Sequence, residues 1–424
     1  MPRIVPKCSR RVTVHVVGAG AAGLAAALRL ARRGRRVVLH EQTRLAGGRA
    51  LALHHPGFGR ALDNGIHLFF GGQRHLQAFA TDIDMPRALV GPDRAACDFI
   101  DTETGRRWTL HPSTGRVPVW MLAPWRAVPG TSAVDFLRLF AMARAGPADT
   151  VARMMPRHGL GRRYFWEPLC IAALNTEPAA ASAQALWQML RNVLASGESP
   201  LLPQFVKRDL TTDLIDPAVR TIVGLGGEVR YGSKLHAIER DSGRATMLRF
   251  GEFSQALGPG EQVVLAVPSA AAGELLQDLT CPRDTRAIVT AHFVLDPPAA
   301  PEPKLTSIIA TRPLWVLTRG DLATVSTGAA DDLMDVPRAE VARRLWEPAA
   351  RALNRGNTLP AWHVLKFRQG TYAHTPADEA RRPPARTRWS NLFLAGDWTR
   401  TGQSATVDGA IQSGYAAADA ALRR

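Results

Sequence analysis

The chain has 424 residues, of which 46% are hydrophobic, and it carries a formal net charge of +16. This length and hydrophobic content allow a large core and favour two domains. The basic residues are scattered or in short runs without a nucleic-acid motif, so we expect a solvated surface with some attraction to anionic lipid and no nucleic-acid partner.

The first predicted elements are a buried strand at 12–17 and an Ala/Leu-rich helix at 24–33, joined by a glycine-rich turn. Gly18 permits the tight turn, Gly20 lets the backbone approach a pyrophosphate, and Gly23 lets the helix pack on the strand. The N-terminus of the helix offers free N–H groups to the anion. This segment therefore predicts a dinucleotide-binding turn.

The strand after this helix ends in Glu41. That residue lies 18 positions beyond Gly23, about the spacing at which an acid accepts hydrogen bonds from the ribose hydroxyls. A Gly-Gly-Arg run ending in Gly48 and Arg49 follows closely. Such a run extends the grip on the pyrophosphate in FAD enzymes, and a nicotinamide-binding domain does not need it.

The middle of the chain has a different character. A strand is predicted at 108–110, and an apolar, proline-broken loop follows at 117–125. Helical periodicity at 133–145, 150–158 and 181–195 predicts a helical substrate domain.

The nucleotide domain is predicted to resume near residue 210. A helix at 214–225 ends at two glycines, and strands are predicted at 228–231, 234–239 and 262–268. Leu235 lies in the second of these strands, and we expect it to contact the cofactor.

The C-terminal segment carries a second cofactor motif, a buried strand that ends in Gly396 and Asp397. This arrangement puts a carboxylate near the pyrophosphate and ribityl chain of FAD. A helix beginning near Thr406, with Ala410 in its first turn, can point its N–H groups at the pyrimidine edge of a flavin and favour the reduced, anionic ring. The motifs at the two ends together predict noncovalently bound FAD.

These elements predict an α/β fold with a Rossmann-like FAD-binding domain of the glutathione reductase/amine oxidase type. The FAD-binding domain is expected to be discontinuous, and a helix-rich, mixed α+β substrate domain is inserted into it. The predicted segments are 11–72, 210–268 and 385–424 for the FAD-binding domain, and 73–209 and 269–384 for the substrate domain.

The four cysteines, Cys8, Cys97, Cys170 and Cys281, are far apart and form no Cys-x-x-Cys pair. We therefore expect no metal site and no disulfide framework, which fits a reducing cytosol. Neither a signal sequence nor a stretch of roughly 20 apolar residues is evident. The predicted location is cytoplasmic, either soluble or peripheral on the inner face of the cytoplasmic membrane.

At this point the chain resembles the amine oxidase and phytoene desaturase superfamily of flavoproteins. Within it, the chain is similar to the hydroxysqualene dehydroxylases, also called squalene-associated FAD-dependent desaturases. The narrower match rests on LDNGIHL at 62–68 with a glycine at 71, FWEPLCIAALNT at 165–176 and GDWTRTG at 396–402.

The resemblance implies reductive removal of the allylic hydroxyl of hydroxysqualene, giving squalene for hopanoid or related triterpenoid biosynthesis. It implies a long-chain isoprenoid substrate and an electron donor, not identified by the sequence, that reduces FAD. It also places Asn64 and Gly65 beside the isoalloxazine. The chain departs from the family pattern at Ile66, commonly glutamine, and at residues 403–404, commonly Leu-Pro.

Two residues are candidates for the catalytic acid. His67 follows the segment that passes near the isoalloxazine, so it is a candidate proton donor, although it can equally be a structural hydrogen-bonding residue. Glu167, between a tryptophan and a proline, is expected in an apolar setting that keeps it protonated, or else as a helix cap or the partner of an arginine. Asp408 is interpreted as a cap of the flavin-facing helix.

Alternative interpretations remain open at this stage. Trp120 and Trp125 either dip into a membrane or line the core. A carotenoid-type desaturase or an amine oxidase is the main alternative enzyme, and Lys304 and Lys366 are the late candidates for the flavin-side lysine of an amine oxidase. A flavin-binding scaffold without turnover is a third interpretation, disfavoured by intact FAD motifs at both ends.

Overall fold

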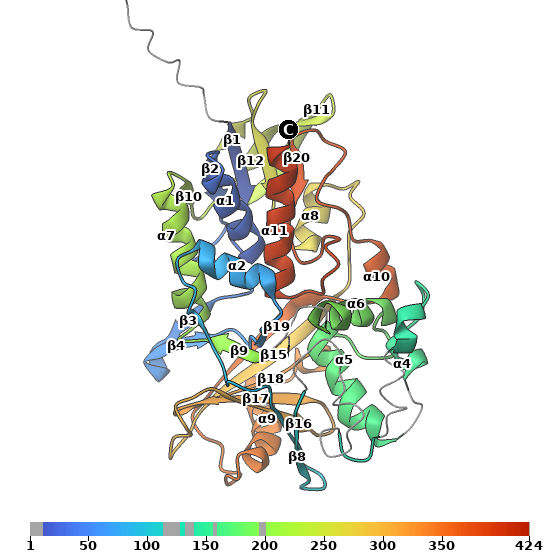
Figure 1. The fold of residues 1–424 in the computed structure, drawn as a ribbon. Coiled ribbons are helices and arrows are strands. Elements are labelled where there is room, and N and C mark those ends of the chain that lie inside the picture. The colour runs from blue at the N-terminus through green and yellow to red at the C-terminus, as the bar shows by residue number, and fades with distance from the viewer. Residues whose placement is uncertain (1–11, 113–127, 132–139, 156–158, 195–200, 424) are drawn as a thin grey trace, which may run out of the picture.

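The computed structural model describes residues 12–112, 128–131, 140–155, 159–194 and 201–423 (Figure 1). Its nucleotide-binding half is built on a five-stranded parallel sheet in the order β10-β2-β1-β14-β20. The strands are β1 (Thr13–Val17), β2 (Arg36–His40), β10 (Glu228–Arg230), β14 (Gln262–Leu265) and β20 (Leu392–Leu394). The strand order brings both ends of the chain into one sheet.

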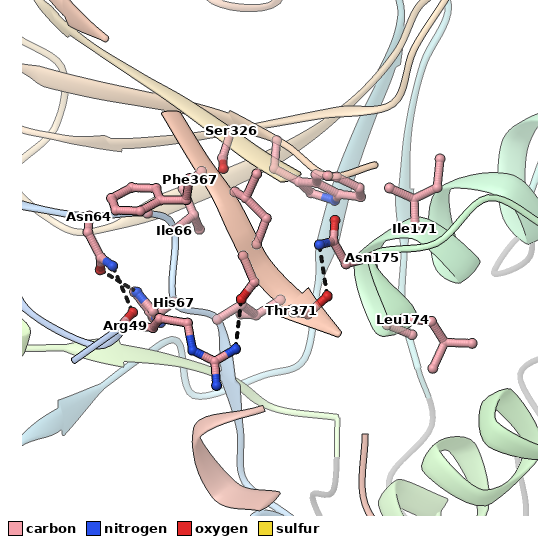
Figure 2. A pocket seen from close by; sticks show the side chains of 18 of the residues that line it. Arg49, Asn64, Ile66, His67, Ile171, Leu174, Asn175, Ser326, Phe367 and Thr371 are labelled. Atoms are coloured by element: carbon pink, nitrogen blue, oxygen red, sulfur yellow. Dashed lines mark hydrogen bonds between the residues drawn. The ribbon is translucent and has the colours of Figure 1, made fainter. Parts of the chain in front are cut away.

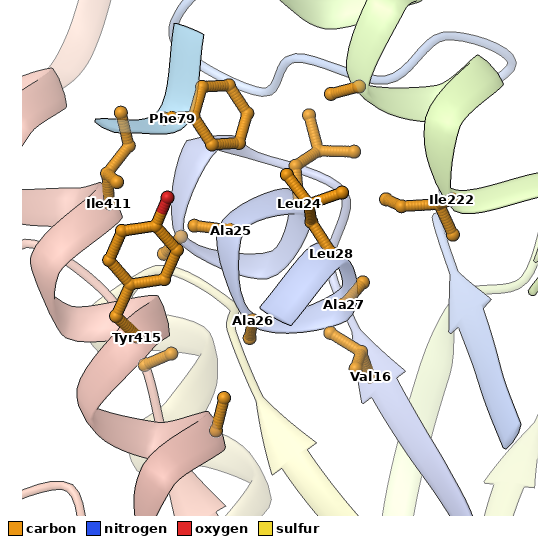
Figure 3. Close-up of a cluster of buried hydrophobic side chains, with 14 of the residues drawn as sticks. Val16, Leu24, Ala25, Ala26, Ala27, Leu28, Phe79, Ile222, Ile411 and Tyr415 are labelled. Carbon is orange, nitrogen blue, oxygen red and sulfur yellow. The ribbon is translucent and has the colours of Figure 1, made fainter. Parts of the chain in front are cut away.

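Helices α1 (Ala21–Arg32) and α11 (Val407–Leu422) cover one face of this sheet (Figure 3). The two helices lie unusually close together, because a Cβ atom added at Gly414 would stand 2.1 Å from the carbonyl oxygen of Ala22. Helices α2 (Arg74–Asp82) and α7 (Asp216–Gly224) extend the same core.

The other face of the sheet packs on a small antiparallel sheet and one short helix. These elements are β11 (Leu235–Asp241), β12 (Arg244–Phe250), β13 (Ser254–Ala256) and α8 (Ser269–Leu275). The alternation of β1 explains the two layers: Val14 and Val16 belong to the core under α1, whereas Val17 belongs to the core on the opposite face.

The second half of the molecule is a seven-stranded sheet in the order β19-β15-β18-β17-β16-β7-β8, antiparallel except between β16 and β7. Helix α9 (Arg338–Ala352) packs on one face of it. The strands are β7 (Cys97–Asp101), β8 (Arg107–Leu110), β15 (Thr285–Val294), β16 (Lys304–Ile309), β17 (Leu314–Arg319), β18 (Leu322–Thr327) and β19 (Trp362–Tyr372).

Three helices, α4 (Val151–Met154), α5 (Glu167–Leu174) and α6 (Ala183–Leu194), form a separate cluster beside this sheet (Figure 1). The remaining elements are the hairpin β3 (Ala52–His55) and β4 (Arg60–Asp63), the short strands β5 (Phe69–Phe70), β6 (Leu89–Val90) and β9 (Pro203–Val206), and helix α10 (Pro376–Ala380). Within the described ranges, no helix is long and apolar enough to cross a membrane.

The mixed α/β architecture with a Rossmann-type sheet confirms the predicted fold class. The helix expected at 214–225 is one continuous helical segment, which begins as a π-helix at Thr211–Ile215 and continues as α7. The helix expected at 181–195 is α6. The helices expected at 133–145 and 150–158 lie only partly within the described residues, and the loop at 117–125 with Trp120 and Trp125 lies outside them.

Candidate active site

The glycine-rich turn between β1 and α1 has the geometry that its sequence predicts. Gly18 adopts a φ of +100°, and a Cβ at Gly23 would lie 1.8 Å from the Gly18 carbonyl oxygen, so no larger residue fits. At Gly20, by contrast, a Cβ would meet only the carbonyl oxygen of Gly47, at 3.9 Å. The turn is therefore packed on the protein side and open where a pyrophosphate would approach.

The first turn of α1 is free to bind an anion. Its N-cap, Gly20, makes no side-chain cap, and its first turn contains no acidic residue. Gly47 N–H donates to the carbonyl of Ala19 at 2.8 Å, which docks the Gly-Gly-Arg run, including Gly48, on this turn. The two segments thus form one cradle at the positive end of the helix dipole.

Glu41 stands at the end of β2, beside the same turn. Its Oε2 accepts a hydrogen bond from Ala19 N–H at 2.8 Å, and its Oε1 accepts from Thr43 N–H at 2.9 Å. Leu235, the first residue of β11, is buried in the core on this side of the sheet. The acid is therefore held rigidly at the position predicted for ribose recognition.

Arg49 joins the N-terminal and C-terminal motifs. Its Nη2 donates to Asp397 Oδ1 at 2.7 Å, and its Nη1 donates to the Gly370 carbonyl at 3.0 Å. Asp397 follows Gly396 directly after β20, so residues 348 positions apart meet at one point. The ion pair raises the pKa of Arg49.

Helix α11 begins where the sequence predicts. The Thr406 hydroxyl accepts from Gly409 N–H at 3.1 Å, and Ala410 N–H already donates to the Thr406 carbonyl within the first turn. Asp408, interpreted as a cap of this helix, instead caps α2: its Oδ1 accepts from Leu76 N–H at 2.8 Å. The correction follows from the close packing of α11 against α2, which brings a second helix N-terminus within reach.

A cavity of about 250 Å³ lies next to this cradle, between α5 and the seven-stranded sheet (Figure 2). Its polar side chains stand in an otherwise apolar wall. The residues that line it are Arg49, Asn64, Gly65, Ile66, His67, Leu68, Ile171, Ala172, Ala173, Leu174, Asn175, Ile288, Leu305, Trp315, Ser326, Gly328, Phe367, Gly370 and Thr371. Arg49 belongs both to the cradle and to this cavity, so the cofactor site opens into it.

His67 is held by a hydrogen bond of 3.0 Å between its Nε2 and Asn64 Oδ1, and Asn64 Nδ2 donates to the Arg49 carbonyl at 2.7 Å (Figure 2). Since Asn64 Oδ1 can only accept, Nε2 carries the imidazole proton and Nδ1 is left as an acceptor. Burial lowers the pKa of His67 to about 4, so the ring is neutral near pH 7.

The opposite wall is fixed by Asn175, which ends α5 in the left-handed conformation at a φ of +48°. Its Nδ2 donates to Thr371 Oγ1 at 3.0 Å, and its Oδ1 accepts from Ala329 N–H at 2.7 Å. These bonds tie α5 to β19 and to the turn after β18. Asparagine tolerates this backbone conformation better than most residues do.

A second cavity, of about 360 Å³, lies next to the first. Four residues, Leu68, Ala172, Leu305 and Trp315, line both cavities. The walls of the second cavity are mainly aliphatic and aromatic side chains and prolines from β5, β7, β9, α5 and β16. The two cavities are thus adjacent and mainly apolar, with His67 among the polar groups of the first and the Lys304–Asp98 ion pair in the lining of the second.

Glu167 is not in the apolar setting expected for a buried acid. Its Oε1 accepts from Arg162 Nε at 2.7 Å, its side chain is 35% exposed, and it does not line either cavity. Burial raises the pKa of Asp63 to about 7, yet this carboxyl accepts from Leu210 N–H and does not line the cavities either. Of the candidate acids, only His67 reaches the space beside the cradle.

The two lysines considered for an amine oxidase lie elsewhere. Lys304 pairs with Asp98 at 3.1 Å beside the second cavity, and Lys366 donates to the carbonyls of Met334 and Val336. Neither lines the cavity that adjoins the cradle. The described residues hold no group of three or more His, Cys, Asp or Glu side chains that could bind a metal ion.

Sequence reasoning missed the wall contributed by the seven-stranded sheet. Ser326 and Trp315 are cross-strand neighbours on β18 and β17, and their side chains face the cavity, whereas Val325 and Val316 face α9. The Ser326 hydroxyl is hydrogen-bonded to Thr290 Oγ1 at 2.9 Å. The period-two alternation of these strands was a usable signal, but nothing local showed which face borders the cofactor.

Comparison with known proteins gives a consistent result. The family model for flavin containing amine oxidoreductases matches residues 21–422. A hydroxysqualene dehydroxylase of Rhodopseudomonas palustris is 38% identical over 411 residues, which are 97% of this chain and 98% of that protein. One of Sinorhizobium fredii is 36% identical over 409 residues, 96% of this chain and 98% of that protein.

The chain is also similar to more distant proteins. A 15-cis-phytoene desaturase of an Oncidium hybrid cultivar is 24% identical, over 97% of this chain and 78% of that protein. The structure of cyclohexylamine oxidase from Brevibacterium oxydans IH-35A superimposes with a TM-score of 0.70 at 17% identity, covering 98% of this chain and 100% of that chain. This last likeness shows the fold alone.

Proposed function

The chain belongs to the flavin containing amine oxidoreductase family and, within it, to the hydroxysqualene dehydroxylases, and on that premise we propose that it removes the hydroxyl group of hydroxysqualene reductively to give squalene. Its cofactor is FAD. The observation that carries the proposal is the pair of adjacent, mainly apolar cavities, the first of which places His67 beside the FAD cradle. A long hydrocarbon with one hydroxyl group matches this distribution of polar and apolar surface.

The residues present fit FAD. The uncapped N-terminus of α1 and the open side of Gly20 suit the pyrophosphate, Glu41 suits the ribose, and the Arg49–Asp397 pair stands where the two motifs meet. The chemistry supplied by bound, reduced FAD is a hydride for the carbon that loses oxygen. The protein has to hold the hydroxyl, deliver a proton to the leaving oxygen so that it departs as water, and exclude bulk water.

We assign the first two tasks to His67. Because Nε2–H is bonded to Asn64, Nδ1 is the atom available to the substrate hydroxyl, from which it can accept a hydrogen bond. The proton for the leaving oxygen comes from solvent: Nδ1 takes it up, and the Nδ1–H group of the imidazolium then donates it to the hydroxyl oxygen, which leaves as water. With a pKa of about 4, the imidazolium is scarce at pH 7 but is a strong acid once formed.

The apolar walls perform the third task. Ile66, Ile171 and Phe367 surround the polar end, and the second cavity offers room for the hydrocarbon away from water. Ile66, which stands where the family commonly has glutamine, makes this wall more apolar than the usual residue. We propose no catalytic role for Glu167, whose partner Arg162 accounts for its position.

We also propose that the two halves of the structure are the two predicted domains. All strands of the parallel sheet come from 11–72, 210–268 and 385–424, and all strands of the seven-stranded sheet come from 73–209 and 269–384. Helix α2, at the start of the second set, nevertheless packs with α1 and α11. Peripheral binding to the cytoplasmic face of a membrane, where such a substrate dissolves, belongs to the same proposal.

The decisive experiment is a single anaerobic turnover. The FAD-loaded protein is photoreduced and mixed with hydroxysqualene, and products are identified by mass spectrometry. We expect squalene, with one deuterium when the reduced flavin carries deuterium and the reaction outpaces solvent exchange. If hydroxysqualene is unchanged and the oxidised protein instead dehydrogenates a saturated isoprenoid, a desaturase replaces this proposal.

A further inference from the structure

A third cavity lies apart from the active site and has five arginines in its lining. Its volume is about 320 Å³, and it shares no lining residue with either apolar cavity. It is formed by the end of α8, the segment after α10 and the loop that follows β20. Its charged lining residues are Arg381, Arg382, Arg386, Arg388, Arg400 and Asp278. The lining thus contains five arginines and one carboxylate.

Three of these arginines have acidic partners. Arg381 pairs with Asp378, Arg382 with Glu379, and Arg388 with Asp278. Asp278 is moreover shared, because Arg240 also donates to it at 3.0 Å. The single carboxylate of the lining is therefore already engaged twice.

The other two arginines of the lining, Arg386 and Arg400, have no acidic partner among the described residues. Arg400 donates only through Nε, to the Arg382 carbonyl at 3.1 Å, so its two terminal nitrogens are left for a ligand. Both side chains are exposed and line the same cavity, so they can offer charge-assisted hydrogen bonds to an anion that enters it.

The cavity is also preorganised. Arg400 N–H donates to the Pro383 carbonyl at 2.8 Å, and Leu394 N–H donates to the Ala385 carbonyl at 2.8 Å. The guanidinium groups of Arg388 and Arg240 lie 4.7 Å and 4.8 Å from the ring centroid of the buried Trp389. The backbone bonds therefore hold together the two loops that carry Arg386 and Arg400, and the indole ring holds Arg388, before any ligand arrives.

From this arrangement we propose that the cavity binds a phosphate-bearing anion, in contact with Arg386 and Arg400. Guanidinium groups bind phosphate oxygens through paired, charge-assisted hydrogen bonds, and a carboxylate-poor, arginine-rich cavity favours a ligand with more than one negative charge. Two sources supply this chemistry: a soluble diphosphate group and the headgroup of an anionic lipid. The site is independent of the proposed reaction.

The test uses FAD-saturated protein, so that the cofactor site is filled. Binding of inorganic diphosphate is measured by isothermal titration calorimetry, and binding of phosphatidylglycerol vesicles is measured by flotation with phosphatidylcholine vesicles as reference. The variant R386E/R400E is compared with R87E/R106E, which changes the charge equally at two exposed arginines elsewhere. R386Q/R400Q removes the positive charges without adding negative ones.

We expect at least a tenfold loss of binding in both cavity variants and little change in R87E/R106E, with flavin absorbance and turnover in detergent retained. Loss confined to diphosphate indicates a soluble phosphate ligand, and loss confined to vesicles indicates a lipid headgroup. Equal binding by wild type and R386Q/R400Q, or equal losses in the cavity and control variants, overturns the proposal.

Discussion

From the low pKa of His67 we predict that acidification changes both the rate of the reaction and the stability of the protein. If the proton for the leaving oxygen is carried on Nδ1, the active fraction of the protein is the imidazolium fraction. With a pKa of about 4, that fraction is roughly one part in a thousand at pH 7 and one in ten at pH 5. The rate of the chemical step should therefore rise about 100-fold between pH 7 and pH 5.

The same titration lowers stability. Because the pKa of His67 in the folded protein lies below the ordinary value of 6.5, the unfolded chain binds more protons between pH 6.5 and pH 4. Stability is therefore lost as the pH falls through this window, and the loss attributable to His67 is about 2 kcal/mol at pH 5. Burial also lowers the pKa values of His15, His40 and His292, so the contribution of His67 has to be isolated by substitution.

His67→Gln isolates it, because the glutamine amide can still donate to Asn64 but does not titrate. The rate is followed as oxidation of reduced flavin in anaerobic stopped-flow single turnovers from pH 8 to pH 5, and stability is followed as urea midpoints of the apoprotein. The exposed His54→Gln serves as the control. If wild type and His67→Gln had the same pH profile of the rate, the proton-donor role would be refuted. If the stability lost between pH 7.5 and pH 5 were the same in wild type and His67→Gln, the assigned pKa would be refuted.

Three further predictions test other parts of the site. Ala172→Trp, at the junction of the two cavities, should raise KM for hydroxysqualene by at least tenfold while leaving a short allylic alcohol unaffected, as measured by steady-state kinetics with both substrates. Asp397→Ala removes the partner of the partly exposed Arg49 and should lower the free energy of unfolding of the apoprotein in urea by about 1.5–3 kcal/mol. The control Asp321→Ala breaks a more exposed ion pair and should lower it by about 1 kcal/mol or less. Equal losses in the two variants would contradict the assigned geometry. Glu167→Gln should retain turnover within about threefold, because Glu167 does not line either cavity, and a loss of ~10²-fold or more would restore it as an acid.

The cofactor-binding part of the fold was largely predictable from the sequence. Its motifs are local, because a few consecutive residues determine the backbone conformation of each. They are the turn at Gly18, the acid at Glu41 and the strand that precedes Asp397. The N-terminal and C-terminal motifs together predicted FAD, and their meeting through Arg49 and Asp397 needed only the parallel strand order that such motifs share. Short-range sterics and hydrogen bonding suffice for predictions of this kind.

The catalytic side of the site was decided by the tertiary structure. Glu167 and Asp408 were interpreted from their sequence neighbours. The partner of Glu167, Arg162, comes within reach through the π-helical turn that precedes α5, and the partner of Asp408, the N-terminus of α2, depends on how helices pack. The cavity wall formed by Ser326 and Trp315 depends on strand pairing in a seven-stranded sheet. Alternation along a strand shows that the sheet has two faces, but it does not show which face borders the substrate. The packing of α9 on one face leaves the other face to the substrate. Sequence alone does not give this choice, because the energy of burial depends on contacts between segments far apart in the chain.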